Sequence, residues 1–222
     1  FNSMIHIADD VYALAYEGAN NKATISTIKI TAAGSVTNSS FITTEEHDDN
    51  NGESNQLVHL SGDKYVIFYK GQDNDGFAKV FKITANGETI EQLSSVLEFA
   101  PQDYYQSSAL KMTDSTAVLA YTGQSSDGFI LTFKVSSDGS SITNTKSLEY
   151  DNSYGFHNSL VRADENTYIL SHSGANNWGR IQTFTISPDG SSITEVANAA
   201  FSDNGYSYWN SLVQVDHDTY VN

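Results

Sequence analysis

The chain has 222 residues, with 27 acidic and 11 basic side chains and no cysteine, which gives a formal charge of -16 and a pI near 4.4. A surface this acidic repels the phosphates of nucleic acids and of anionic lipids, so neither is an expected partner. Disulfides are excluded, and because no apolar run approaches the roughly 18 residues of a membrane span, membrane insertion is not expected either.

A repeat of about fifty residues runs through the chain. Each copy is marked by a glycine that a second glycine follows sixteen residues later, and the marker glycines are Gly18, Gly71, Gly123 and Gly174. The copies keep one register in this core, and all changes of length fall in the stretch before the next copy. A fixed core with a variable junction predicts a repeat fold such as a propeller. We expect a single propeller domain or propeller fragment over residues 1–222, with repeats at about 2–54, 55–106, 107–157 and 158–209 and a partial fifth at 210–222.

The hydrophobic period within each copy is two, which predicts strands rather than helices. The third strands of the first three copies are expected at residues 24–30, 77–83 and 129–135. In the fourth copy we expect strands at 159–163, 167–171, 180–186 and 193–201, with a loop at 174–179 and a tight turn at Asp189 and Gly190. The predicted fold is therefore an all-β propeller of four-stranded antiparallel blades, with four complete repeats and the first strand of a fifth.

Two related segments carry a family resemblance. The run from Asn210 to Tyr220, and its copy from Asn158 to Tyr168 followed by Gly174, resemble the short-blade β-propeller repeats of large secreted bacterial proteins. The shared motif is structural, with apolar strand residues, turn glycines and Asn or Ser at the strand start. The resemblance implies non-catalytic modules of extracellular or cell-surface proteins that are linked to adhesion or glycan binding. Propeller lectins are similar in blade size.

The number of copies allows two interpretations of how many blades the propeller ring has. The chain fits a fragment of a ring with five or more blades, or a four-bladed ring in which residues 210–220 duplicate residues 2–12. Unpaired blade edges can also join several chains, or neighbouring domains of a longer chain.

Aromatic residues gather on one predicted face of the propeller. Because the strands alternate in direction, the loop between the second and third strands lies on the same face as the junction between copies, and both tryptophans fall there. Pyranose rings offer C–H faces for stacking and hydroxyls for amides, which makes this face a candidate glycan site. The alternative is that the rings are wedges that fill the space between blades. The candidate ligand-binding residues are Tyr104, Tyr105, Tyr154, Asn177, Trp178, Tyr206, Tyr208 and Trp209.

A second set of residues repeats on the first strand of each copy. It predicts either an anion or water site near the axis of a ring or exposed side chains beside the first hairpin turn, and we favour the turn. The residues are His6, His59, Lys111, Arg162 and Gln214. No acid or cysteine shares their register, so a metal is not expected there.

Calcium has one candidate loop. Asp73 and Asp75 resemble the oxygen-rich start of a calcium loop, but the closing glutamate of an EF-hand is missing and the equivalent loops lack the second acid. We expect turn chemistry there, with calcium as the alternative, and no other cofactor.

Catalytic motifs are missing from the sequence. It contains no Gly-x-Ser-x-Gly elbow, no His-Glu-x-x-His and no phosphate-binding glycine loop. Asp103, Asp151 and Asp203 recur near the copy junctions, which favours turn acids over the unlike pair of a glycosidase. We expect a non-catalytic secreted binding or adhesion module. The alternatives are a purely structural repeat block of a surface protein or extracellular fibre and, third, a glycan-active enzyme.

Overall fold

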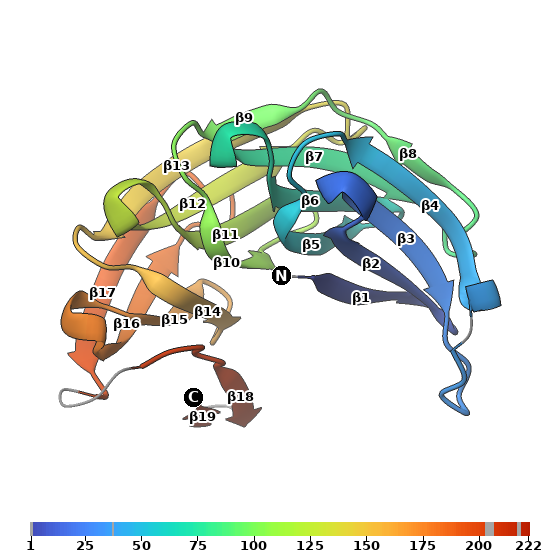
Figure 1. Cartoon of the computed structure of the whole chain (residues 1–222). Coiled ribbons are helices and arrows are strands. Elements are labelled where there is room, and N and C mark those ends of the chain that lie inside the picture. The colour runs from blue at the N-terminus through green and yellow to red at the C-terminus, as the bar shows by residue number, and fades with distance from the viewer. Residues whose placement is uncertain (1, 37, 203–206, 217–218) are drawn as a thin grey trace. The chain divides into compact units, whose positions relative to one another are not determined.

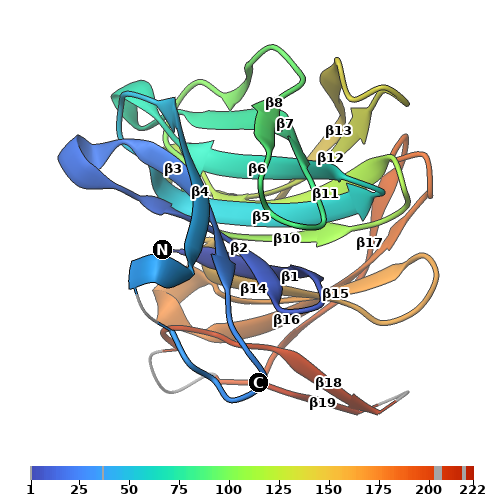
Figure 2. The same ribbon diagram turned by 90° about the vertical axis from the view of Figure 1, so that its right-hand side faces the viewer.

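The computed structural model describes residues 2–36, 38–202, 207–216 and 219–222. It is all-β, and the predicted antiparallel sheets are confirmed (Figure 1). Four sheets follow one another along the chain, one for each repeat, and a two-stranded sheet belongs to the partial fifth repeat. Within the first sheet the strands lie side by side in chain order (Figures 1 and 2).

The strands have the following bounds. The first sheet contains β1 (Ser3–Ala8), β2 (Val11–Glu17), β3 (Ala23–Lys29) and β4 (Phe41–Asp48). The second contains β5 (Glu53–Ser61), β6 (Lys64–Lys70) and β7 (Gly76–Ile83), and its outer strand is divided into β8 (Ile90–Gln92) and β9 (Leu97–Ala100). The third contains β10 (Tyr105–Lys111), β11 (Thr116–Thr122), β12 (Gly128–Val135) and β13 (Ile142–Asp151). The fourth contains β14 (Phe156–Arg162), β15 (Thr167–Ser173), β16 (Gly179–Ile186) and β17 (Ile193–Ala200), and β18 (Val213–Asp216) pairs with β19 (Thr219–Val221).

Short 3-10 turns join the second and third strands of the four full sheets. They are η1 (Ala19–Asn21), η3 (Gln72–Asn74), η4 (Gln124–Ser126) and η5 (Ala175–Asn177), and a further turn, η2 (Asn38–Ser40), precedes β4. Within the described residues no helix is long and apolar enough to cross a membrane.

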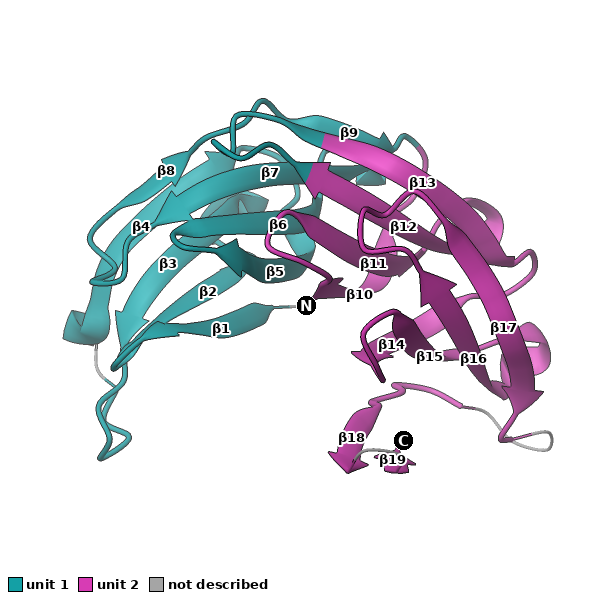
Figure 3. Cartoon of the chain, turned by 180° about the vertical axis from the view of Figure 1, so that it is seen from behind, with its two compact units in different colours: residues 1–101, 135–142 teal, residues 102–134, 143–222 magenta. Residues whose placement is uncertain are grey.

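The chain divides into two compact units (Figure 3). Unit 1 contains residues 1–101 and 135–142, and unit 2 contains residues 102–134 and 143–222. The core of unit 1 lies between its first two sheets, where Ala13 and Ile25 pack with Tyr65, Ile67 and Phe81. A single small sheet cannot bury its apolar faces alone, so stacking of sheets within a unit supplies the core.

Unit 2 has a core of the same kind between the third and fourth sheets. Val118 and Ile130 from the third sheet pack with Tyr168, Leu170 and Phe184 from the fourth. The side chains come from alternate positions of their strands, as expected for sheets that use one face for packing.

The junctions between sheets contact the 3-10 turns, which confirms that junction and loop share a face. In unit 1 the backbone N–H of Gly52 donates to the carbonyl of Asn21 at 2.8 Å. In unit 2 the N–H of Ser207 donates to the carbonyl of Asn177, also at 2.8 Å. The middle residue of each of these turns has a φ between 58° and 61°, a conformation that Asn and Asp adopt more readily than other side chains.

Candidate ligand-binding site

Three of the predicted aromatic residues come together in unit 2 with two further rings. Tyr154 lies over Phe156, with ring centroids 4.5 Å apart, and Phe156 lies 6.1 Å from His157. His157 in turn meets Tyr208 at 5.3 Å and Trp209 at 5.0 Å, both edge-on. We call these five residues the aromatic row. Tyr208 is 50% exposed and Trp209 is 66% exposed, so the row ends in two rings that face solvent.

The backbone of the row is held in a repeated conformation. His157 and Trp209 both have positive φ, 58° and 62°, and each stands three residues before a buried leucine of the repeat. The Gln106 side chain accepts a hydrogen bond from the His157 N–H at 2.7 Å. Ser54 and Gln106 have positive φ at the equivalent positions, 51° and 45°, so the left-handed residue belongs to the junctions of the repeat and not to the row alone.

Tyr104 and Tyr105 are placed differently from the row. Tyr104 is fully buried, its hydroxyl donates to Ser107 Oγ at 2.6 Å, and its ring lies beside Tyr121. Its ring therefore has no face for a ligand, which corrects its place among the stacking residues, because at this junction the aromatic is a packing wedge. Tyr105 is half-buried and donates to Asp103 Oδ1 at 3.1 Å.

The other predicted residues lie around η5. Asn177 and Trp178 are both half-buried. The Asn177 carbonyl accepts from Ser207, while its side-chain Oδ1 is buried without a donor among the described residues, so that oxygen is not presented to a ligand in this structure. Tyr206 lies outside the described residues.

A pocket of about 520 Å³ opens at the end of β13, next to the aromatic row. Asp151 Oδ1 accepts hydrogen bonds from the backbone N–H of Ser153 and of Tyr154, each at 3.0 Å, and from the Ser153 hydroxyl at 2.8 Å. Tyr154 therefore links the pocket to the row. The pocket is lined by Glu149, Tyr150, Asp151, Asn152, Ser153, Ala175, Arg180 and Asn198.

Gly174 lies beside two charged side chains of this pocket. A Cβ at this position would lie 3.2 Å from Asp151 Oδ2 and 2.8 Å from Arg180 Cγ. Arg180 Nη1 donates to Asn198 Oδ1 at 3.4 Å, and within the described part of the chain no carboxylate forms a salt bridge with it.

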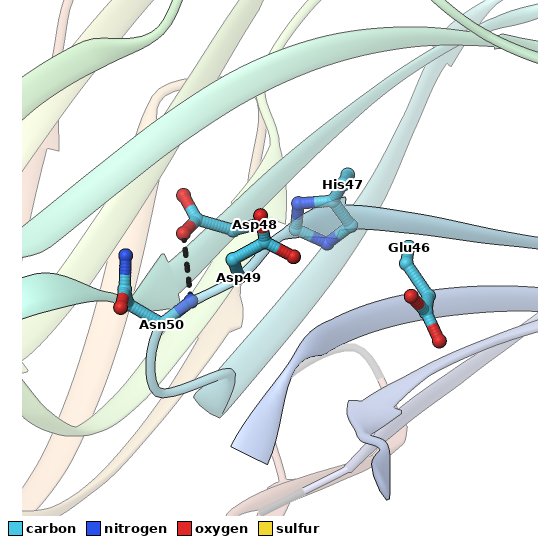
Figure 4. A pocket seen from close by; sticks show the side chains of 5 residues that line it. All are labelled: Glu46, His47, Asp48, Asp49 and Asn50. Atoms are coloured by element: carbon cyan, nitrogen blue, oxygen red, sulfur yellow. Dashed lines mark hydrogen bonds between the residues drawn. The ribbon is translucent and has the colours of Figure 1, made fainter. Parts of the chain in front are cut away.

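Unit 1 contains an equivalent pocket of about 330 Å³ at the end of β4, lined by residues 46–50 (Figure 4). Its carboxylates are already engaged. Lys22 Nζ contacts Glu46 at 2.8 Å and Asp49 at 3.1 Å. Asp48 accepts the backbone N–H of Asn50 at 3.1 Å, drawn as the dashed line in Figure 4. Because the lysine neutralises two of its acids, this pocket is the weaker candidate for a ligand.

The hydrogen bonds of the repeated first-strand residues confirm the expectation that they lie exposed beside the hairpin turn. His6 Nε2 donates to the carbonyl of Asp9 at 2.7 Å, and His59 Nε2 donates to that of Gly62 at 2.9 Å. Arg162 donates in the same way to the carbonyl of Asp164 at 3.1 Å. These side chains therefore cap their own turns.

The candidate calcium loop is a 3-10 turn. Asp73 has a φ of 58° and accepts from the Gln72 side chain at 3.3 Å, and the Asp75 N–H donates to the Gln72 carbonyl at 3.0 Å. The described residues contain no group of three or more His, Cys, Asp or Glu that could hold a metal ion. We propose no ion at this loop.

Sequence reasoning missed the pocket. Asp151, Arg180 and Asn198 come from β13, β16 and β17, and only the pairing of strands brings them together. The one signal in the sequence is the departure from the repeat, because Arg180 occupies the place that Phe77 and Phe129 hold in two other copies.

Comparisons with known proteins show the fold. The sequence matches no protein-family model and no curated protein sequence. A solved structure of a Lactobacillus plantarum protein is 18% identical, with a TM-score of 0.60, over 86% of this chain and 54% of that one. A candidate 6-phosphogluconolactonase of Bacteroides fragilis is 11% identical, with a TM-score of 0.59, over 92% of this chain and 57% of that one. The α-L-arabinofuranosidase of Fusarium graminearum is 13% identical, with a TM-score of 0.56, over 90% of this chain and 65% of that one.

These similar structures are β-propellers, so the chain has a propeller fold. The chain spans between about half and two thirds of the length of the three proteins. The resemblance to the repeat modules of large secreted bacterial proteins stays a prediction.

Proposed function

We propose that this chain is a non-catalytic binding module that captures a glycan on the aromatic row of unit 2. The observation that carries the proposal is the exposure of Tyr208 and Trp209, at 50% and 66%. Both rings pack edge-on against the ring of His157. Large exposed rings that gather on one surface are uncommon in soluble proteins and mark interaction sites.

A sugar suits this surface for two reasons. Aromatic faces stack on the C–H faces of a pyranose ring, and tyrosine hydroxyls at the rim give and accept hydrogen bonds. Burial raises the pKa of Tyr154, and the neighbouring Tyr208 raises it further, so the phenol stays protonated and can donate at neutral pH. Structures with the same fold include a sugar-processing enzyme, which is compatible with a glycan ligand.

The second candidate is a purely structural repeat block in a surface protein or fibre. The observation that favours it is Tyr104, which is fully buried at its own junction and acts there only in packing. Tyr208 and Trp209 differ from Tyr104 in that their rings face solvent, and this contrast can be tested by substitution.

The test is the variant Trp209→Ala, with Phe41→Ala as the control because Phe41 is also an exposed ring, 43% exposed and placed in unit 1. Wild type is screened on a glycan array, and affinity for the strongest hit is then measured by calorimetry. We expect Trp209→Ala to weaken binding about tenfold, which is about 1.4 kcal/mol, with an unchanged melting temperature. Phe41→Ala should bind as wild type does.

Three results would count against the proposal. A folded wild type that binds no glycan would favour the structural role. Loss of stability in Trp209→Ala without loss of affinity would show that the ring is a wedge. Release of reducing sugar from the bound glycan would show catalysis, against the non-catalytic part of the proposal.

A further inference from the structure

We infer that the pocket at the end of β13 binds a second sugar unit, so that the site takes a neutral oligosaccharide of two or more units rather than a single or a charged sugar. The inference rests on the proposed function, because it assigns the ligand class and adds a subsite to the aromatic row.

The pocket and the row are joined through Tyr154. Asp151 Oδ1 holds the backbone N–H of Tyr154, and the Tyr154 ring lies against Phe156 at 4.5 Å. The same side chain is close enough to Tyr208 for that phenol to raise its pKa. A ligand stacked on Tyr208 and Trp209 can therefore continue past Tyr154 into the pocket without leaving the protein surface.

The pocket offers both hydrogen-bond acceptors and donors. Within the described residues, Asp151 Oδ2 and the Glu149 carboxylate accept no hydrogen bond, while Arg180 has one contact, to Asn198. A guanidinium carries five N–H donors and each carboxylate oxygen two lone pairs. Neighbouring sugar hydroxyls both donate and accept, so they can pair with the carboxylates and with the guanidinium at the same time.

The charges in the pocket select a neutral ligand. A uronate would pair with Arg180 but would also meet the carboxylates of Glu149 and Asp151 on a chain whose formal charge is -16. An amino sugar would meet the Arg180 guanidinium. Two carboxylates and one guanidinium line the pocket, so either ion would meet a like charge there and a neutral sugar avoids both repulsions.

The equivalent pocket of unit 1 shows what a closed arrangement looks like. There Lys22 contacts both Glu46 and Asp49, which uses the acceptors that the unit 2 pocket leaves open. In the repeat that carries Glu149 and Asp151, the position of Lys22 is taken by Asp127, so no cation at this position covers the acids. The polar groups of this pocket are therefore available to a ligand in unit 2.

The experiment uses the whole chain and a defined set of probes. They are cello-, xylo-, manno-, galacto- and arabino-oligosaccharides of one to six units, with oligogalacturonides and chitosan oligosaccharides as charged counterparts. Affinities are measured for wild type, Trp209→Ala, Asp151→Asn and Arg180→Met, with Lys134→Met as a control because Lys134 is an exposed cation outside the pocket. Asp151→Asn keeps the Oδ1 acceptor that shapes the loop, and melting curves verify that each variant folds.

We expect one neutral series to bind, with affinity rising about tenfold from the monosaccharide to the disaccharide or trisaccharide. Asp151→Asn and Arg180→Met should remove that gain while the monosaccharide still binds, and Trp209→Ala should weaken every length. A site that prefers oligogalacturonides or chitosan oligosaccharides, or one with equal affinity for all lengths, would overturn the inference and leave the proposed function standing. Pocket variants that bind the longer sugars as wild type does would also overturn it. Absence of binding to every probe would instead defeat the proposed function itself.

Discussion

The ring of His47 in unit 1 stands edge-on to the ring of Tyr69, with centroids 4.9 Å apart and planes at 83°. Unit 2 contains the same pair with the partners exchanged, because Tyr150 of β13 lies 4.9 Å from His172 of β15. In both units the pair joins the outer strand of one sheet to the second strand of the next. The ring nitrogens of both histidines are buried and have no hydrogen-bond partner among the described residues, so each imidazole is packed as a neutral ring.

These histidines predict that the protein loses stability in acid. Burial, and after it the charge of Lys79, lower the pKa of His47 to about 3. Between the ordinary value near 6.5 and about 3, the unfolded chain binds a proton at His47 that the folded chain does not. The free energy of unfolding therefore falls as the pH falls, by about 1.4 kcal/mol per pH unit. Burial also lowers the pKa of His172, with the same sign. Urea unfolding between pH 7 and pH 4 measures the effect.

The variant His47→Phe isolates this contribution. A phenyl ring keeps the packing against Tyr69 and loses no hydrogen bond, since the imidazole makes none with the described residues. We expect its stability to fall less steeply than that of wild type below pH 6, and the double variant with His172→Phe to fall less steeply still. Parallel curves for wild type and both variants would show that the acid sensitivity lies elsewhere.

Among the acids of unit 1, Asp48 is predicted to contribute most to the free energy of unfolding. It accepts the Tyr69 hydroxyl at 2.7 Å and lies 3.5 Å from Lys79 Nζ, whose side chain is only 7% exposed. Asp48→Ala would leave this ammonium buried without its carboxylate, so we expect a loss of about 3 kcal/mol in the free energy of unfolding. Chemical denaturation at pH 7 gives the value.

Asp49→Ala is the matched control. Asp49 also contacts a lysine, Lys22 at 3.1 Å, but its side chain is 82% exposed. Water screens such a pair, and we expect a loss below about 1 kcal/mol. Equal losses for the two variants would mean that burial of Lys79 does not govern the contribution of Asp48.

The strands could be predicted because each has a local cause in the sequence. The third strands predicted at 24–30, 77–83 and 129–135 agree with β3, β7 and β12 to within one residue at each end. Alternating apolar residues define the strands, and the marker glycines stand directly before the 3-10 turns between the second and third strands. The N–H of Gly174, for example, donates to the carbonyl of Trp178 at 2.8 Å.

The site could be predicted only in part, because the sequence does not show which aromatic ring is covered. Tyr104 occupies the repeat position that Gly52 and Gly155 hold, where the chain passes closest to a neighbouring strand, so its ring is buried. Trp209 stands two places further along its own repeat than that position and is exposed. The exchanged histidine–tyrosine pairs could not be predicted from the sequence either, since each pair joins residues of two different sheets.

Gly52 and Gly155 lead to a prediction about the close approach of junction and strand. An added Cβ would lie 2.3 Å from the Ala23 Cα at Gly52 and 2.3 Å from the Gly128 Cα at Gly155. Backbone atoms cannot move aside as a side chain can, so Gly52→Ala and Gly155→Ala should each destabilise by about 3 kcal/mol. Gly34→Ala is the comparison, because its Cβ would meet nothing within 4 Å and only its φ of 72° opposes the change, at about 1 kcal/mol. Similar losses at all three glycines would refute the argument from crowding.

Two buried threonines are predicted to tie neighbouring sheets together in the same way in each unit. Thr27 Oγ1 donates to the carbonyl of Gly87 at 2.6 Å in unit 1, and Thr132 Oγ1 donates to that of Gly190 at 2.6 Å in unit 2. Replacement by valine keeps the shape but leaves a buried carbonyl unpaired, so each variant should lose about 1–2 kcal/mol.

Thr194→Val, on the exposed strand β17, supplies the control, and we expect a change within about 0.5 kcal/mol. Guanidinium denaturation compares the three variants with wild type. If Thr27→Val and Thr132→Val were no less stable than Thr194→Val, the bond between hydroxyl and hairpin carbonyl would add nothing to stability. Apolar packing alone would then hold the sheets of each unit together.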